Sequence, residues 1–176
     1  GTTSLDASSA LSLMHRGQPD IRYRKVAILA ADGVDGDQVE ALQKRLEAEG
    51  AQGLIIAPSM APVATVQGGT LTPDAMLNGL PSVTLDAVAV APGDDSVKAL
   101  AGSGLGLYYV QEAYKHLKPI AALGDGANVL QAAGIEVPED GVFSAQTVDD
   151  LYADFQEAIR GHRVWSRDAK ANDMPA

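Results

Sequence analysis

The chain contains no cysteine among its 176 residues. This absence excludes disulfide bonds, thiolate catalysis and cysteine-ligated zinc or iron–sulfur centres. Aromatic residues make up only 5% of the sequence, so a core must be built mainly from Ala, Val, Leu and Ile. No apolar run approaches the roughly 20 residues of a membrane-spanning helix, and the block Val26–Ala31 is far too short. We therefore expect no membrane among the partners.

Positive charge is also in short supply. The sequence has 13 Lys and Arg residues against 23 Asp and Glu residues, which gives a formal net charge of -10. An acidic surface repels phosphate backbones, so we expect no nucleic acid among the partners. The first residues, Gly1–Ala10, are small and polar and lack the apolar stretch of a signal peptide. We expect a cytoplasmic location, with secretion of a longer parent protein as the alternative.

The pattern along the chain predicts one domain with two flanking segments. Residues 1–24 have few apolar positions and are expected to form a linker or arm. Residues 25–161 alternate apolar runs of strand length with helical patterns, which favours a three-layer α/β sandwich with a mostly parallel sheet and helices on both faces. Residues 162–176 form a C-terminal tail, in which we expect Trp165 to pin the tail to the surface.

Individual elements can be placed from their periodicity. The four runs predicted to be buried strands are 25–31, 53–57, 86–91 and 119–123. Helical spacing predicts helices after the first and third runs and over 147–159, where Thr147 can act as the cap. Of the remaining segments, 62–72 is predicted to be a hairpin, 73–77 a short helical turn, 83–85 a short strand, and Gly102–Gly106 a glycine-rich loop.

In a parallel sheet of this kind, ligands bind beyond the carboxyl ends of the strands. Asp32, Asp35 and Asp37 follow the first predicted strand, where carboxylates can bind a hard cation or share a proton. Aspartate is also a favoured turn and helix-cap residue, and we favour that interpretation. The glycines of 102–106 lack the lysine and the preceding strand that a phosphate-binding loop requires, so phosphate binding is not favoured.

Histidines offer no metal site either. His15, His116 and His162 are far apart in the sequence and none has metal-ligand spacing with another. His116 lies near a predicted helix C-terminus, where it would interact favourably with the helix dipole. We expect no metal in this chain.

The sharp turn at Gly124-Asp125-Gly126 follows the fourth predicted strand. Such a corner, from a core strand into a helix, is where a nucleophile elbow places its reactive Ser or Cys. Gly124 supplies no nucleophile, and Asp125 has no histidine nearby in the sequence to support it. A plain tight turn is the favoured interpretation.

Three stretches of the sequence also resemble a known protein family. They are Glu112–Ala121, the segment His162–Arg167 with the terminal Pro175-Ala176, and Ser9–Leu13 ahead of Arg24–Ile28. Together they resemble the C-terminal domain of large-subunit (clade 2) catalases over nearly the whole chain. The resemblance implies a flavodoxin-like sandwich related to class I glutamine amidotransferases and PfpI-type proteases.

Those relatives carry a catalytic Cys at the elbow and an acidic residue after the first strand. The resemblance places the elbow at Gly124 and the acidic position near Gly36, so both positions would be vestigial. It therefore implies no catalytic residue and no cofactor in this chain.

The resemblance also implies a parent enzyme. Large-subunit catalases dismute hydrogen peroxide at a haem held by an upstream body, and they are homotetramers. We expect this domain to contact that body and neighbouring subunits, to stabilise the tetramer and to border substrate access. The alternative is a holdase chaperone that binds unfolding client proteins, and a PfpI-type amidase or protease is less favoured because the Cys is missing.

Overall fold

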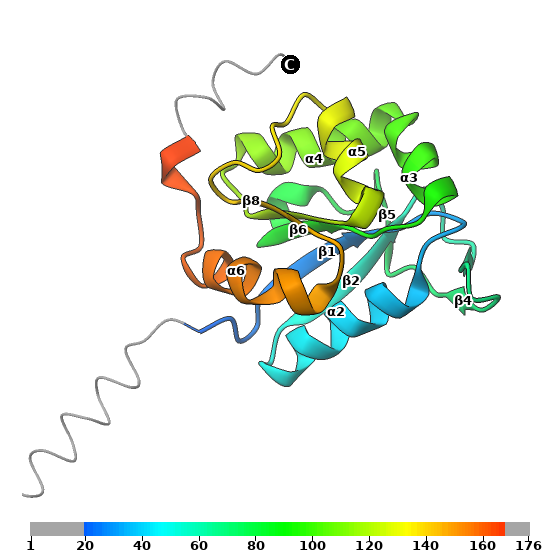
Figure 1. The fold of residues 1–176 in the computed structure, drawn as a ribbon, viewed down its shortest axis with the longest axis horizontal. Helices are drawn as coiled ribbons and strands as arrows, with labels where there is room; N and C mark the ends of the chain where they lie inside the picture. The colour runs from blue at the N-terminus through cyan, green and yellow to red at the C-terminus, as the bar shows by residue number, and fades with distance from the viewer. Residues whose placement is uncertain (1–19, 168–176) are drawn as a thin grey trace, which may run out of the picture.

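A computed structural model describes residues 20–167 of the chain (Figure 1). Six strands form one parallel sheet in the order β5-β2-β1-β6-β7-β8. Without the edge strand β5, this is the flavodoxin-like order, which confirms the predicted fold class. The strands are β1 Lys25–Leu29, β2 Gln52–Ala57, β5 Ala75–Met76, β6 Ala87–Val90, β7 Ile120–Leu123 and β8 Val142–Ala145.

Helices cover both faces of this sheet (Figure 1). One face packs against α2 (Gly36–Ala48) and α6 (Val148–Arg160). The other face packs against α3 (Asp94–Ala101), α4 (Gly104–Lys115) and α5 (Ala127–Ala132). The result is the three-layer sandwich expected from the alternating pattern.

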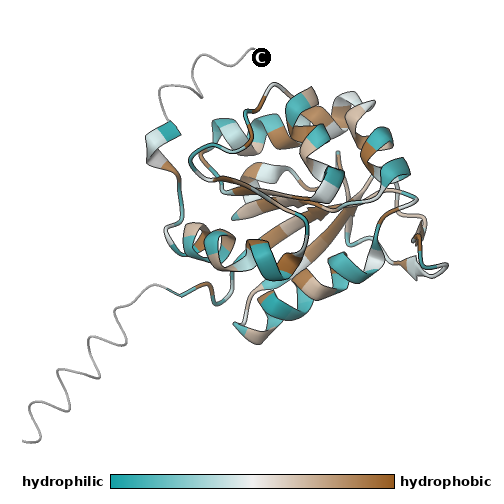
Figure 2. Ribbon diagram, viewed as in Figure 1, coloured by the Kyte–Doolittle hydropathy of each residue, from teal (hydrophilic) through white to brown (hydrophobic). Residues whose placement is uncertain are grey.

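Alternation along each strand explains how one sheet serves two cores. In β1, Val26 and Ile28 belong to the cluster under α2 and α6, whereas Ala27 and Leu29 belong to the cluster under α3, α4 and α5. Successive side chains of a strand point to opposite faces, so a continuous apolar run is buried on both sides. Figure 2 shows the strands as a hydrophobic centre between helices whose outward faces are hydrophilic.

The two helices on the α2 side begin and end where the sequence predicts. The side chain of Asp35 accepts hydrogen bonds from the amides of Asp37 and Gln38 and so caps α2. Thr147 caps α6 by accepting from the amide of Asp150. Gly50 has a left-handed φ of 78° just beyond α2, as a helix-terminating glycine does.

Three local predictions were wrong. The segment 73–77 contains strand β5 instead of a helical turn, because the amides of Asp74 and Leu77 donate to carbonyls of β2. The predicted strand at 83–85 is replaced by a 3-10 helix at Ser82–Thr84. The predicted loop Gly102–Gly106 is largely helical, since α4 begins at Gly104 with Ser103 as its cap.

The predicted hairpin at 62–72 is present, as β3 (Val63–Ala64) paired antiparallel with β4 (Thr70–Leu71). It is fixed across the end of β1 by backbone hydrogen bonds. The amide of Gly33 donates to the carbonyl of Ala64 at 2.8 Å, and the amide of Val66 donates to the carbonyl of Val34 at 2.9 Å. The hairpin therefore covers the loop between β1 and α2.

Segments outside the predicted domain bounds also pack on the sheet. Ile21 is fully buried in the core under α2 and α6. After α6, a 3-10 helix at Trp165–Arg167 returns over the start of β7, and Arg167 is only 1% exposed. His15, Ser9–Leu13, Pro175-Ala176 and the side chain of Trp165 lie outside what the structure describes. No helix in residues 20–167 is long and apolar enough to cross a membrane.

Candidate functional site

The loops that follow β1, β6 and β7 meet at the carboxyl edge of the sheet. The amide of Asp35 donates to the carbonyl of Pro92 at 2.8 Å, which joins the first two loops. Gly93 has a φ of 135°, and a Cβ there would lie 2.3 Å from the carbonyl oxygen of Gly33. Glycine is thus required for this approach, and the loops pack against one another directly.

Gly124 occupies the corner between β7 and the turn that leads into α5. Its φ is 53°, which is the left-handed backbone expected of a sharp strand-to-helix corner. A Cβ at this position would lie 3.2 Å from the Cβ of Pro92. The corner has the backbone of an elbow but no side chain, and our interpretation of it as a vestigial elbow stays a prediction.

Asp125, the other candidate at this corner, has a structural partner. Its carboxylate oxygen Oδ1 accepts a hydrogen bond from the amide of Gly93 at 2.9 Å. The described histidines lie elsewhere, since His116 is the C-cap of α4 and His162 follows α6. Asp125 therefore ties two loops together, and neither described histidine lies on these loops.

Gly36 is the first residue of α2 and lies beneath the hairpin. A Cβ at Gly36 would lie 2.7 Å from Cγ2 of Thr65. The amide of Gly36 donates to Oε1 of Gln67 at 3.0 Å, and Nε2 of Gln67 donates to Asp35 at 2.8 Å. The hairpin therefore fills the space that a side chain at the predicted acidic position would need.

The three aspartates after β1 serve the backbone. Oδ1 of Asp32 accepts from the amide of Ala64 at 2.9 Å, and Oδ1 of Asp35 caps α2. Within residues 20–167, no group of three or more His, Asp and Glu side chains is placed to hold a metal ion. The turn and cap interpretation is confirmed for Asp32 and Asp35, and the amide of Asp37 is one of the capped groups.

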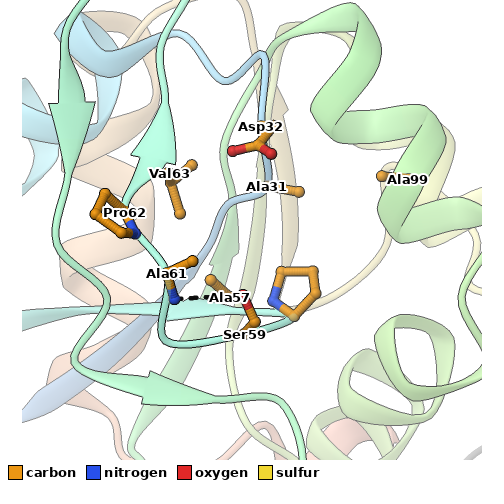
Figure 3. A pocket seen from close by; sticks show the side chains of 9 residues that line it. Ala31, Asp32, Ala57, Ser59, Ala61, Pro62, Val63 and Ala99 are labelled. Carbon is orange, nitrogen blue, oxygen red and sulfur yellow. Dashed lines mark hydrogen bonds between the residues drawn. The ribbon is translucent and has the colours of Figure 1, made fainter.

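A small cavity opens beside this edge, between the ends of β1 and β2 (Figure 3). Its volume is about 190 Å³, below the roughly 300 Å³ at which ligand pockets usually begin. Its polar side chains, Asp32 and Ser59, already accept hydrogen bonds from the amides of Ala64 and Ala61. The walls are otherwise apolar and are formed by Ala31, Ala57, Pro58, Ala61, Pro62, Val63 and Ala99. The two polar side chains of the cavity therefore stabilise nearby backbone amides.

The glycine-rich segment Gly102–Gly106 includes the start of α4 and packs against the end of α3. Oγ of Ser103 accepts from the amide of Gly106 at 3.2 Å. A Cβ at Gly106 would lie 2.5 Å from the carbonyl oxygen of Leu100, so glycine permits α4 to approach the end of α3. This geometry explains the glycine without a phosphate ligand.

A second cavity, of about 280 Å³, lies between α4 and the 3-10 helix at Ser82–Thr84. Three large apolar side chains at its rim are exposed: Val83 at 40%, Leu105 at 48% and Tyr108 at 57%. At its wall, the hydroxyl of Tyr109 donates to the carbonyl of Leu80, and burial raises the pKa of Tyr109. We call this feature the α4 groove.

Sequence reasoning missed the most buried cation of the described chain. The guanidinium of Arg167 donates to the carbonyls of Tyr114 and Lys118 and lies 4.6 Å from the centre of the Tyr114 ring. Burial lowers its pKa to about 10. No spacing rule could identify this contact, because it joins Arg167 to the end of α4 and to the loop before β7, 53 and 49 residues earlier in the sequence.

Comparison with known proteins decides the family. Residues 22–169 match the family model described as the C-terminal domain found in long catalases. This chain belongs to that family. This chain is 44% identical over 170 residues to catalase HPII of Pseudomonas aeruginosa. The match covers 96% of this chain and 24% of the relative.

Other relatives also match nearly the whole of this chain with only about a quarter of their own length. Catalase HPII of Mycobacterium avium is 38% identical, over 98% of this chain and 26% of its own length. Catalase-B of Dictyostelium discoideum is 32% identical, over 96% of this chain and 24% of its own length. The chain thus spans about a quarter of the length of these relatives.

Proposed function

We propose that this chain is the non-catalytic C-terminal domain of a haem catalase, and that it stabilises the tetramer and borders substrate access. The proposal is supported by the lack of room and of reactive side chains at two positions on the carboxyl edge of the sheet. The corner at Gly124 has no side chain, and Thr65 fills the space beside Gly36. A domain built this way contributes through its packing surface.

Neither of the two cavities described above fits a haem. These two cavities have volumes of about 190 Å³ and 280 Å³, below the usual range of ligand pockets. The polar side chains that line them are carboxylates, hydroxyls and one amide, and no histidine is among them. We therefore assign haem to the body of the longer protein.

The decisive experiment removes the domain from the full-length parent and follows the loss of catalase activity on heating. We expect the half-life of activity to fall several-fold, because the tetramer loses a packed surface. A matched variant, Phe155→Ala in the full-length parent, should shorten the half-life to a smaller extent by weakening the domain core. An unchanged half-life after deletion would contradict the proposal.

The chaperone alternative is supported by one feature, the α4 groove. Its exposed rim of Val83, Leu105 and Tyr108 is the kind of apolar surface that can hold an unfolding client. If the isolated chain is a holdase, it should suppress heat aggregation of a client enzyme, and Tyr108→Ser should weaken that suppression. Aggregation that continues at a several-fold molar excess of the chain would rule the alternative out.

A further inference from the structure

The amino edge of the sheet lies opposite the loops described above and gathers residues that precede three neighbouring strands. Arg24 directly precedes β1, Asp86 directly precedes β6, and Lys118 lies just before β7. The segment after α6 returns to this edge, where the amide of Val164 donates to the carbonyl of Leu117 at 2.7 Å. Both ends of the described chain therefore lie on this side of the domain (Figure 1).

This edge is cationic although the chain as a whole is acidic, with a net charge of -10. Nη1 of Arg24 lies 3.5 Å from Oδ1 of Asp86 and 2.8 Å from Nε2 of His162. Lys118 is only 7% exposed. Burial lowers its pKa, and so do the charges of Arg163 and Arg24, whereas Asp86 raises it. Further negative charge placed against this edge would be favourable.

The backbone is strained at the same edge. The three non-glycine residues of the described chain with a left-handed φ are Tyr23 at 68°, Leu117 at 62° and His162 at 76°. Each lies beside one of the cations just named. Residues held in such conformations cluster at functional sites, where the surrounding structure maintains the strain.

Tyr23 is the most informative of the three. The amide of Arg24 donates to the carbonyl of Ile21 at 3.0 Å, which closes a turn with Tyr23 at its third position. Glycine or asparagine is favoured there, because φ is positive. The turn instead carries a tyrosine whose exposure is 83%. An exposed, amphipathic aromatic ring beside an arginine is typical of the centre of a protein interface.

We propose that the amino-edge surface, formed by Tyr23, Arg24, His162 and Arg163 above the buried Lys118, packs on the rest of the longer protein, and that its occupant is a carboxylate-bearing surface of the preceding catalase body. Two observations select this occupant: the chain enters the domain at this edge, and the edge is complementary to negative charge. The inference rests on the proposed function, and it adds the surface and the chemistry of its partner.

Hydrogen exchange can locate the contact. Amides of residues 21–25, 116–118 and 162–166 should exchange more slowly in the full-length parent than in the 176-residue chain. Amides of the hairpin and of the α4 groove should exchange equally in both. Protection confined to the hairpin or the groove would overturn the proposal. Self-association of the isolated chain that protects its amino edge to the same degree as in the parent would also overturn it.

A variant tests the role of the tyrosine itself. Tyr23→Gly relieves the backbone strain, so it should raise the melting temperature of the 176-residue chain. In the full-length parent it should instead shorten the half-life of activity on heating, because the ring is lost from the interface. Val66→Ala, at an exposed apolar side chain of the hairpin, should leave that half-life unchanged. A longer or unchanged half-life for Tyr23→Gly in the parent would contradict the assignment.

The two proposals can fail separately. If deletion of the domain leaves thermal inactivation unchanged while the amino edge is still protected from exchange, the stabilising role is wrong and the contact surface stands. If deletion shortens the half-life but protection lies at another face, the stabilising role stands and the contact surface is wrong.

Discussion

Replacing Gly126 by alanine would test how closely α5 approaches the sheet. Gly126 ends the turn after β7, and a Cβ there would lie 2.7 Å from the carbonyl oxygen of Val90 in β6. Contacts under 3.0 Å force a shift, and this one is with backbone, which cannot move without displacing the strand. Overpacking of this kind costs about 1–3 kcal/mol of unfolding free energy.

Two other glycines separate this steric cost from the effects of backbone conformation. Gly104 has no atom within 4 Å of an added Cβ and starts α4, so Gly104→Ala should gain roughly 0.5–1 kcal/mol. Gly134 has equally free space but a φ of 80°. Gly134→Ala should therefore lose about 1 kcal/mol through the left-handed conformation alone.

The assay is urea unfolding of the three variants, followed by circular dichroism. We expect Gly104→Ala to be more stable than the unsubstituted chain, and Gly134→Ala and then Gly126→Ala to be less stable. The unfolding free energy of all of them should depend on urea concentration with a similar slope. A Gly126→Ala variant as stable as Gly104→Ala would refute the close approach of α5 to β6.

Three further predictions concern other contacts. Phe155→Ala removes a fully buried ring that packs edge-on against Phe143 and should cost about 3–5 kcal/mol in urea unfolding. Arg167→Ala removes buried hydrogen bonds to backbone carbonyls and should cost about 2–3 kcal/mol in the same assay. The pKa of His162 is lowered by burial and by Arg24 from its usual 6.5, so the unfolded chain binds more protons below that pH. Stability should fall as pH drops below 6.5, and His162→Asn should flatten that slope in unfolding midpoints measured across the range.

Local sequence patterns were sufficient where neighbours along the chain make the contacts. The apolar runs of β1 and β6 are buried on both faces, as their composition predicts. Asp35 and Thr147 cap their helices because a cap acts on amides two or three residues away. The glycine at the corner after β7 could also be predicted from the order of strand, turn and helix.

The patterns failed where a distant segment decides the conformation. Residues 73–77 look helical in isolation, yet β2 offers free carbonyls and the segment pairs with them as β5. Ser103 and the glycines after it suggest a loop, whereas contact with the end of α3 makes them the start of α4. In both cases long-range contacts outweigh a weak local preference.

The sequence by itself determined the layers of the sandwich and the lack of a reactive side chain at Gly124, because periodicity and residue identity are properties of the chain. Only the tertiary structure decided that Thr65 fills the space beside Gly36, that Arg167 is buried, and that Tyr23 stands exposed among cations at the amino edge. Each of these depends on segments far apart in the sequence that folding places together, and no spacing along the chain encodes that contact.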